Sequence, residues 1–253
     1  MGLIFFFLYA PLIVLIAFSF NESKSRSVWT GFSVKWYTKL FADKEILQAL
    51  FNTVVVAVVA SILATIIGTL ACFGILKMKK WTKKFVMSVN NFPVVNPEIV
   101  TGVSLMLLFV FAYNTFGIFK PGLLTLILAH TTFCLPYVIL SVLPKLRQIN
   151  PHLYEAAQDL GCPPAKAFVK IILPDIMPGI ITGMIMAFTL SLDDFVISYF
   201  TSGTMQTLPI AIYSMTRKIV SPEINALSTL LFVAVLVLLL IVNFRQAKAE
   251  INN

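Results

Sequence analysis

The chain has 253 residues, of which 58% are hydrophobic and 12% are charged, and its mean hydropathy is +0.91. These values exclude a soluble globular domain, so we expect an integral membrane protein embedded in a lipid bilayer. The net charge of +8 then lies in the loops, where it indicates the orientation of the chain in the membrane. A nucleic-acid partner is not expected, because the protein would need a soluble basic face to bind it.

Six apolar runs are long enough, or nearly so, to cross a hydrocarbon core about 30 Å thick. None of them contains Lys or Arg. The sequence therefore predicts an all-α, polytopic membrane protein with six transmembrane helices in a single transmembrane domain over residues 1–253. The runs are residues 3–20, 50–76, 99–113, 123–143, 176–200 and 226–244.

The loop after the first run, residues 21–48, carries Trp29, Trp36 and Tyr37. Aromatic side chains beside a span usually form a belt at the membrane interface, and the pattern favours this interpretation. The alternative places Trp36 and Tyr37 on a substrate pathway, as aromatic contacts for a cation, or against a docking protein.

The second run is followed directly by five lysines, which predict that the next connection is cytoplasmic. If the spans alternate in direction, residues 145–175 and both termini fall on that same side. Small residues within the run predict close packing against another helix. The small residues are Ala57, Ser61, Ala64 and Gly68, and the lysines are Lys77, Lys79, Lys80, Lys83 and Lys84.

Residues 90–98, NNFPVVNPE, precede the third run. Two prolines and three asparagines oppose a lipid-exposed helix, because backbone groups freed by proline lack partners in hydrocarbon. We therefore expect this segment to be buried in protein or to line a wet cavity. Glu98 opens the next helix, either as an ordinary acid in its first turn or as part of a substrate pathway.

Two residue types in the apolar runs could carry chemistry but are interpreted as packing residues. His130 is interpreted as a hydrogen-bonded histidine of the interior rather than as a ligand. Cys72 and Cys134 lie in separate runs without metal-ligand spacing, so neither a metal nor a disulfide is expected.

The loop over residues 145–175 contains a polar, helix-forming stretch. Asn150 is a good N-cap and Pro151 suits the first helical position, so a short helix is predicted there. Gly161 ends it, and a second helical piece from Ala165 is expected to stop at Pro174. A rod of about 15 Å fits a groove in a partner protein. The alternative is a connector on the lipid headgroups, which would need a bulkier apolar face.

Seven positions of this stretch resemble the EAA motif of ABC importer permeases of the MetI-like type. In that family the motif is a cytoplasmic coupling helix that docks on the ATPase subunit. The resemblance implies that these residues transmit motion without contacting substrate. They are Glu155, Ala156, Ala157, Gly161, Ile171, Leu173 and Pro174.

The fifth run begins with Gly179 and Gly183 at a close-packing spacing and contains the adjacent acids Asp193 and Asp194. Each charge at a bilayer centre costs about 2.5 to 3.5 kcal/mol, so acids there usually have a function. We assign both, with Glu98, to a substrate pathway. The alternative is an acid pair that marks the helix end, against which residues 196–200 continue apolar. An aspartyl protease would need acids on different helices.

Residues 201–222 are expected to be irregular or re-entrant. The chain has no nucleotide site of its own, because Leu123 and Leu124 stand where a P-loop needs Lys and Ser or Thr. We therefore expect a non-catalytic permease subunit that binds no cofactor, with ATP and Mg on a partner. The resemblance implies a second permease subunit, two ATPase copies and an external substrate-binding protein, in a bacterial inner membrane.

The acids of the spans select a cationic substrate by charge. Three stretches also resemble the corresponding segments of permeases from bacterial polyamine importers, which implies that spermidine or putrescine is carried. A permease for another cationic or chelated substrate is the alternative, and an ATP-independent carrier or channel is a further one. The stretches are FCLPYVILSV, SLDDFVISYF and LPIAIYSMTRKIVSPEINALSTLL.

Overall fold

The computed structural model describes residues 2–23, 28–217 and 223–251. Over these residues the regular structure is helical apart from one isolated bridge between Asn21 and Phe32, which confirms the all-α prediction. The chain forms two compact units, one of residues 1–52 and 206–253 and the other of residues 53–205. Each is described by itself. The single domain over residues 1–253 stays a prediction.

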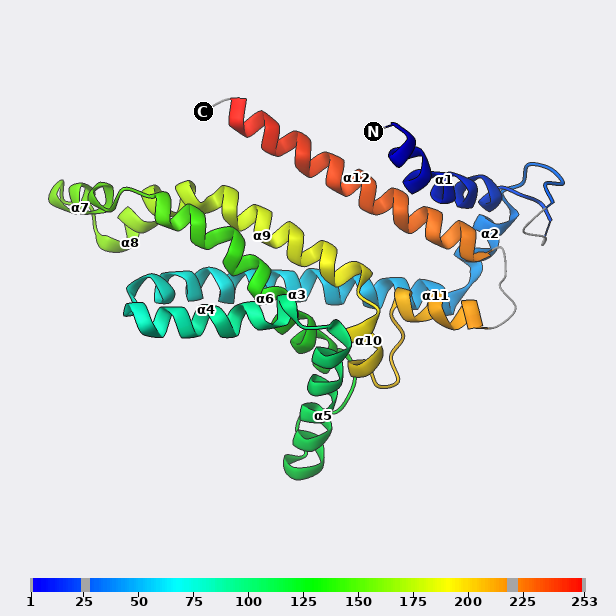
Figure 1. Cartoon of the computed structure of the whole chain (residues 1–253), viewed down its shortest axis with the longest axis horizontal. Helices are drawn as coiled ribbons and strands as arrows, with labels where there is room; N and C mark the ends of the chain where they lie inside the picture. The colour runs from blue at the N-terminus through cyan, green and yellow to red at the C-terminus, as the bar shows by residue number, and fades with distance from the viewer. Residues whose placement is uncertain (1, 24–27, 218–222, 252–253) are drawn as a thin grey trace. The chain divides into compact units, whose positions relative to one another are not determined.

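The first unit contains four helices and the start of a fifth (Figure 1). The long α12 (Glu223–Ile251) packs against α1 (Gly2–Ser19), α2 (Lys35–Ala42) and α11 (Leu208–Arg217). Leu40, Leu208 and Leu227 form its buried apolar core with Ile46 at the start of α3 (Lys44–Lys77). An ion pair between Lys39 and Glu223 also joins α2 to α12.

The second unit is built around α6 (Leu123–Gln148), which packs against α9 (Leu173–Asp193) along most of its length. The remainder of α3 and α4 (Lys80–Val95) lie on α6 as well. The short α10 (Val196–Thr201) packs on α5 (Glu98–Phe116) and on α6. Between α6 and α9 the chain forms α7 (Pro151–Asp159), α8 (Pro164–Ala167) and the π-helical turn η1 (Phe168–Ile172).

Close packing against α6 depends on glycine. A Cβ atom at Gly179 would lie 2.9 Å from the carbonyl oxygen of Ser141, and one at Gly183 would lie 3.1 Å from Val138 Cα. On α3, a Cβ at Gly68 would lie 2.8 Å from Val138 Cγ1. The small residues predicted to allow close helix approach therefore do so, on two helices that contact the same segment of α6.

Five of the six predicted apolar runs each coincide with a single helix, and the run over residues 176–200 is divided between α9 and α10. Among the described residues, five helical segments have the length and composition to cross a membrane: α1, α3, α5, α6 and the continuous helix from Pro164 to Asp193. The sixth, α12, has 29 residues, and its apolar part is described over Glu223–Val237. The chain is a multi-pass membrane protein.

The structure corrects the prediction for residues 90–98. They do not form an irregular buried segment, because α4 continues as a helix through Asn90, Asn91 and Pro93 as far as Val95. Proline removes only one backbone bond in the last turn, and the break comes at Asn96, which is extended before Pro97. None of the residues of α4, all of which the structure describes, is buried.

Residues 201–222 are also more regular than expected. They include α11, which is helical from Leu208 to Arg217, and a turn at Gly203, whose φ is 62°. The rest of that expectation, over residues 218–222, lies outside the described residues.

Candidate functional site

The predicted coupling segment forms an exposed helix and corner at one end of the second unit. Asn150 caps α7 as expected, since its Oδ1 atom accepts the backbone N–H of His152 at 3.0 Å. Gly161 ends this helical segment in the left-handed region, with φ of 81°. There the backbone N–H of Cys162 donates to the carbonyl of Ala157 at 3.0 Å. The corner is thus fixed by its own backbone.

Several described side chains of this segment are exposed. Glu155 and Ala156 are exposed, and so is Leu160, of which 89% is accessible. The Glu155 carboxylate contacts only its neighbour His152 among the described residues, with 3.2 Å between Oε2 and Nδ1. An exposed leucine beside an acid, on a helix held rigidly at both ends, is a surface suited to a protein partner.

The second half of the segment differs from the prediction. Pro174 does not stop the helix that starts at Pro164; it lies in the first turn of α9, and the helical path continues to Asp193. The π-helical turn at residues 168–172 explains this, because a widened turn leaves room for a residue that has no N–H to donate. Ile171 and Leu173 are partly buried at this junction.

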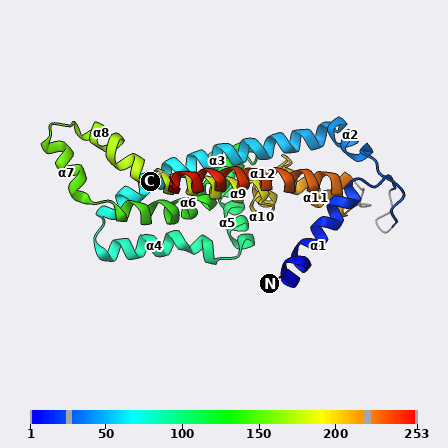
Figure 2. The same cartoon turned by 90° about the horizontal axis from the view of Figure 1, so that it is seen from above.

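The coupling segment and the lysine-rich turn between α3 and α4 lie at the same end of the second unit, as both views show (Figures 1 and 2). Helix α9 runs from this end to Asp193. Its 21 residues make a rod of roughly 31 Å, about the thickness of a hydrocarbon core.

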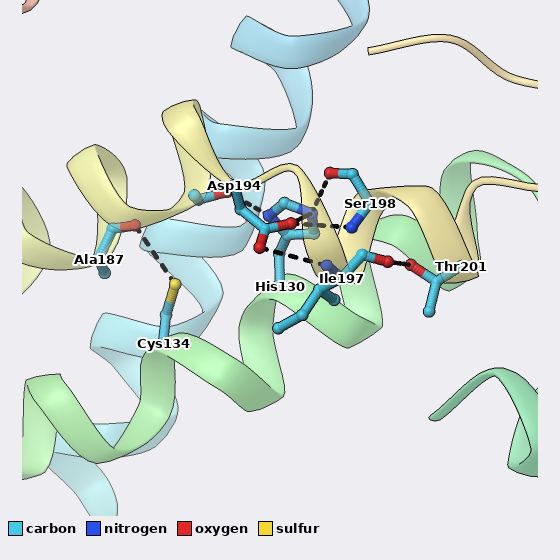
Figure 3. Close-up of polar contacts among 8 residues, drawn as sticks. His130, Cys134, Ala187, Asp194, Ile197, Ser198 and Thr201 are labelled. Carbon is cyan, nitrogen blue, oxygen red and sulfur yellow. Dashed lines mark hydrogen bonds and ion pairs between the residues drawn. The ribbon is translucent and has the colours of Figure 1, made fainter. Parts of the chain in front are cut away.

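At the far end of α9, four polar side chains form a buried cluster around a break in the helix (Figure 3). His130 of α6 bonds to Ser191 through Nδ1, at 2.7 Å, and to Ser198 through Nε2, at 3.0 Å. Its Nε2 is also 3.6 Å from Asp194 Oδ2. His130 is 1% exposed, so the prediction of a hydrogen-bonded interior histidine is confirmed.

Asp194 is the residue at which α9 ends and α10 begins. Its backbone is extended, and its carboxylate accepts the N–H groups of Ser198 at 2.8 Å and of Ile197 at 3.3 Å. These are the free donors at the start of α10, so Asp194 acts as its cap. The predicted single span over residues 176–200 is therefore interrupted, and the acids lie at a boundary between two helices, as the alternative of a pair that marks a helix end proposed.

Asp193, one residue earlier, is exposed. The charge of Glu98 acts on Asp193 and on the hydroxyl of Tyr137, so groups from α5, α9 and α6 share one neighbourhood. Glu98 is also exposed, in the first turn of α5. Gly102 brings this helix close to α10, because a Cβ there would lie 3.0 Å from the ring of Phe200.

Trp36 and Tyr37 belong to the first unit, unlike the three acids. Trp36 is 2% exposed, and its Nε1 donates to the carbonyl of Asn21 at 2.6 Å. The Tyr37 hydroxyl lies 2.7 Å from Ser19 Oγ. Both side chains fix α2 to the end of α1. A buried tryptophan with its N–H bonded internally is not a free aromatic surface for a cation.

Sequence reasoning missed Ser191 and Ser198 as partners of His130. A signal existed, since the two serines flank Asp194 at three residues before and four after it. Thr201 belongs to the same structure, because its carbonyl accepts the hydroxyl of Thr125 at 2.9 Å and so ties α10 to α6. Cys134 also bonds across to α9, at Ala187 O, 3.3 Å away.

Comparison with known proteins identifies the protein family. Residues 64–248 match the model of the binding-protein-dependent transport system inner membrane component. The chain is 42% identical to the putrescine transport system permease protein PotI of Escherichia coli K12 over 250 residues, which cover 97% of this chain and 89% of PotI. It is 39% identical to the spermidine/putrescine transport system permease protein PotC of the same organism over 241 residues, covering 95% and 89%.

Solved structures share the fold. A bacterial ABC transporter involved in the import of the acidic polysaccharide alginate superposes with a TM-score of 0.72 at 19% identity, covering 98% of this chain and 92% of that one. A bacterial alginate ABC transporter in complex with an alginate pentasaccharide-bound periplasmic protein gives 0.71 at the same identity, covering 96% and 89%.

Proposed function

Because the chain belongs to the family of binding-protein-dependent transport system inner membrane components, we propose that it is a permease subunit of an ATP-driven importer that carries polyamines into the cytoplasm. Its fold is the all-helical one of MetI-like ABC importer permeases. The observation that carries the proposal is the continuous α9, which joins an exposed docking segment to the acids at its other end.

The docking segment supports a partner that hydrolyses ATP. Glu155 and Ala156 of α7 and Leu160 at its C-terminal cap are exposed, and Asn150 and Gly161 fix the two ends of this helical segment. Because the lysine-rich turn lies at the same end of the second unit, the positive-inside rule assigns this end to the cytoplasm. If the six predicted spans alternate in direction, both termini lie on that side as well. Two ATPase copies, with ATP and Mg on them, a second permease subunit and an external binding protein complete the transporter.

The mechanism follows from rigid coupling. Closure of the ATPase subunits on ATP displaces α7 and α8, and α9 moves with them as one rod. Helix α6 moves together with α9, because the two helices are packed too closely at Gly179 and Gly183 to slide past each other gradually. The displacement therefore reaches the break at Asp194, where α10 meets α5.

The acids at that end support a cationic substrate. Asp193 and Glu98 are both exposed, and the charges of Asp194 and Glu98 act on Asp193, so a cation near Asp193 would be attracted by several carboxylates. A diamine or triamine suits such a site, since its ammonium groups donate only. Asp194 serves the same site indirectly, by holding the start of α10. The similarity to PotI, a putrescine permease by name, and to PotC, a spermidine/putrescine permease by name, supports the same class of substrate.

Polyamine uptake tests the substrate. In proteoliposomes that hold the complete transporter, we expect Asp193→Asn to lower uptake of labelled putrescine or spermidine by about tenfold, because a charge-assisted hydrogen bond contributes roughly 1.5 to 3 kcal/mol. The matched control is Asp175→Asn, an exposed acid at the other end of the same helix. Equal uptake by both variants would remove Asp193 from the pathway and favour a different substrate.

An assay of ATP hydrolysis tests the docking segment separately from the substrate site. Glu155→Ala should lower substrate-stimulated ATP hydrolysis by about tenfold, the loss of one charge-assisted contact, while the subunit still inserts into the membrane and the binding protein still docks. The measurement is phosphate release with and without the loaded binding protein. Uptake that continues at the normal rate without ATP hydrolysis would show a carrier and contradict the proposal.

A further inference from the structure

Helix α4 carries an exposed apolar stripe, which is unusual beside a lysine cluster. Trp81, Phe85, Val89 and Phe92 are 82%, 63%, 57% and 66% exposed. At 3.6 residues per turn these four positions fall within about 80° of one another, so they form one face. Met87, on the opposite side of the helix, and Val86, between that side and the stripe, pack against the core around α6.

The lysines lie at one end of this stripe. Lys80 and Lys84 are exposed and fall about 60° to 100° to one side of Trp81, next to the first two aromatic rings. Lys77 and Lys79 are exposed in the turn that leads into the helix. Within the described part of the chain, none of these four ammonium groups forms an ion pair with a carboxylate.

We propose that this surface, Lys80, Trp81, Lys84, Phe85, Val89 and Phe92, is a binding site for an anionic phospholipid of the cytoplasmic leaflet. The phosphate lies at Lys80 and Lys84, and an acyl chain lies along the aromatic stripe. From Trp81 to Phe92 the stripe is roughly 17 Å long, close to half of a hydrocarbon core of about 30 Å. It therefore matches one leaflet.

The combination of groups selects a lipid over a protein. An ATPase subunit outside the membrane could meet the lysines but not a stripe that runs alongside a membrane-crossing helix. A second permease could cover the stripe but would leave several cations without counter-charge. A phospholipid offers an anion and a hydrocarbon chain in one molecule, and an exposed tryptophan is typical of the boundary between the two. Juxtamembrane lysine clusters attract anionic headgroups in the same way.

Native mass spectrometry of the intact transporter complex tests the site. The complex in detergent is titrated with phosphatidylglycerol and with phosphatidylcholine of the same chain length. We expect tighter binding of phosphatidylglycerol, and Lys80→Gln with Lys84→Gln should weaken it by roughly 10- to 30-fold, since each lysine near an anionic surface contributes a factor of about five. Lys80→Arg with Lys84→Arg should restore it.

Two further variants separate the sources of binding. Trp81→Ala with Phe85→Ala should weaken binding of phosphatidylglycerol but not of soluble glycerophosphoglycerol; equal loss of both would identify a headgroup site without a chain. Lys166→Gln with Lys170→Gln removes two cytoplasmic lysines elsewhere and should change lipid affinity little.

Three results would overturn the proposal. They are equal affinity for the two lipids, equal loss in the Lys166 and Lys170 control, and loss of a protein subunit instead of lipid from the Lys80 and Lys84 variant.

Discussion

The two ends of α9 are built in opposite ways. At its first residue the helix emerges from a widened turn that leads back to an exposed segment, where a Cβ at Gly161 would have no atom within 4 Å. At its last residue it meets a cluster in which His130, Asp194 and Ser198 are buried and bonded to one another. One end is available to a partner, and the other is held by the chain's own core. We therefore expect α9 to transmit a displacement of its first residue to its last residue.

The largest effect is expected where α9 is locked to α6. Gly179→Leu would force side-chain atoms into the carbonyl of Ser141, and we expect it to lower the free energy of unfolding by about 3 kcal/mol or more. The control is Gly74→Leu on α3, which has nothing within 4 Å of its Cβ position. Denaturant unfolding in mixed micelles measures both, and comparable losses would show that the contact is not tight.

A sharper comparison uses the adjacent acids. Asp194→Ala leaves two backbone donors of α10 without their acceptor, and we expect a loss of about 2 kcal/mol in the free energy of unfolding. Asp193→Ala, exposed and outside the cluster, should stay within about 0.5 kcal/mol. The same micelle unfolding experiment distinguishes them. If both variants unfold alike, the division of the acids into a structural and a substrate-facing residue is wrong.

The smallest effect is expected at the exposed end. Gly161→Ala introduces a left-handed alanine, which costs about 1 kcal/mol locally, with no steric contact to add to it. We expect global unfolding to change little, because the corner is outside the core, while affinity for the ATPase subunit falls about fivefold. Pull-down of the ATPase at several concentrations measures this. A loss of global stability instead would mean that the corner belongs to the folded core.

Much of the fold was predictable from apolar runs and special backbone residues. Hydrophobic length indicated the helices that carry the predicted runs, although not the break within the fifth run, and glycine and N-cap chemistry indicated α7 and its end, because both signals are local. That Asp194 is buried and hydrogen-bonded while Asp193 is exposed was not predictable. It depends on His130 and Ser198, which lie 64 and 4 residues away from Asp194 and meet it only in the packed structure.

Proline was the least reliable signal. Pro93 and Pro174 both lie within helices, although each was interpreted as a breaker. In each case only one backbone bond is lost, and the neighbouring geometry accommodates it: a last turn for Pro93 and a widened turn before Pro174. The sequence shows that proline lacks a backbone N–H donor. It does not show whether the helix needs the hydrogen bond that this N–H would form.

The widened turn at residues 168–172 also has a consequence for the length of the chain. Such a turn holds one residue more than an ordinary helical turn does. Deleting a single residue there would turn the widened turn into an ordinary helical turn, and the residues before it would keep nearly the same angular position around the axis of α9. Relatives that lack one residue at this point should therefore have an uninterrupted α-helix here and still direct Glu155 to the same side.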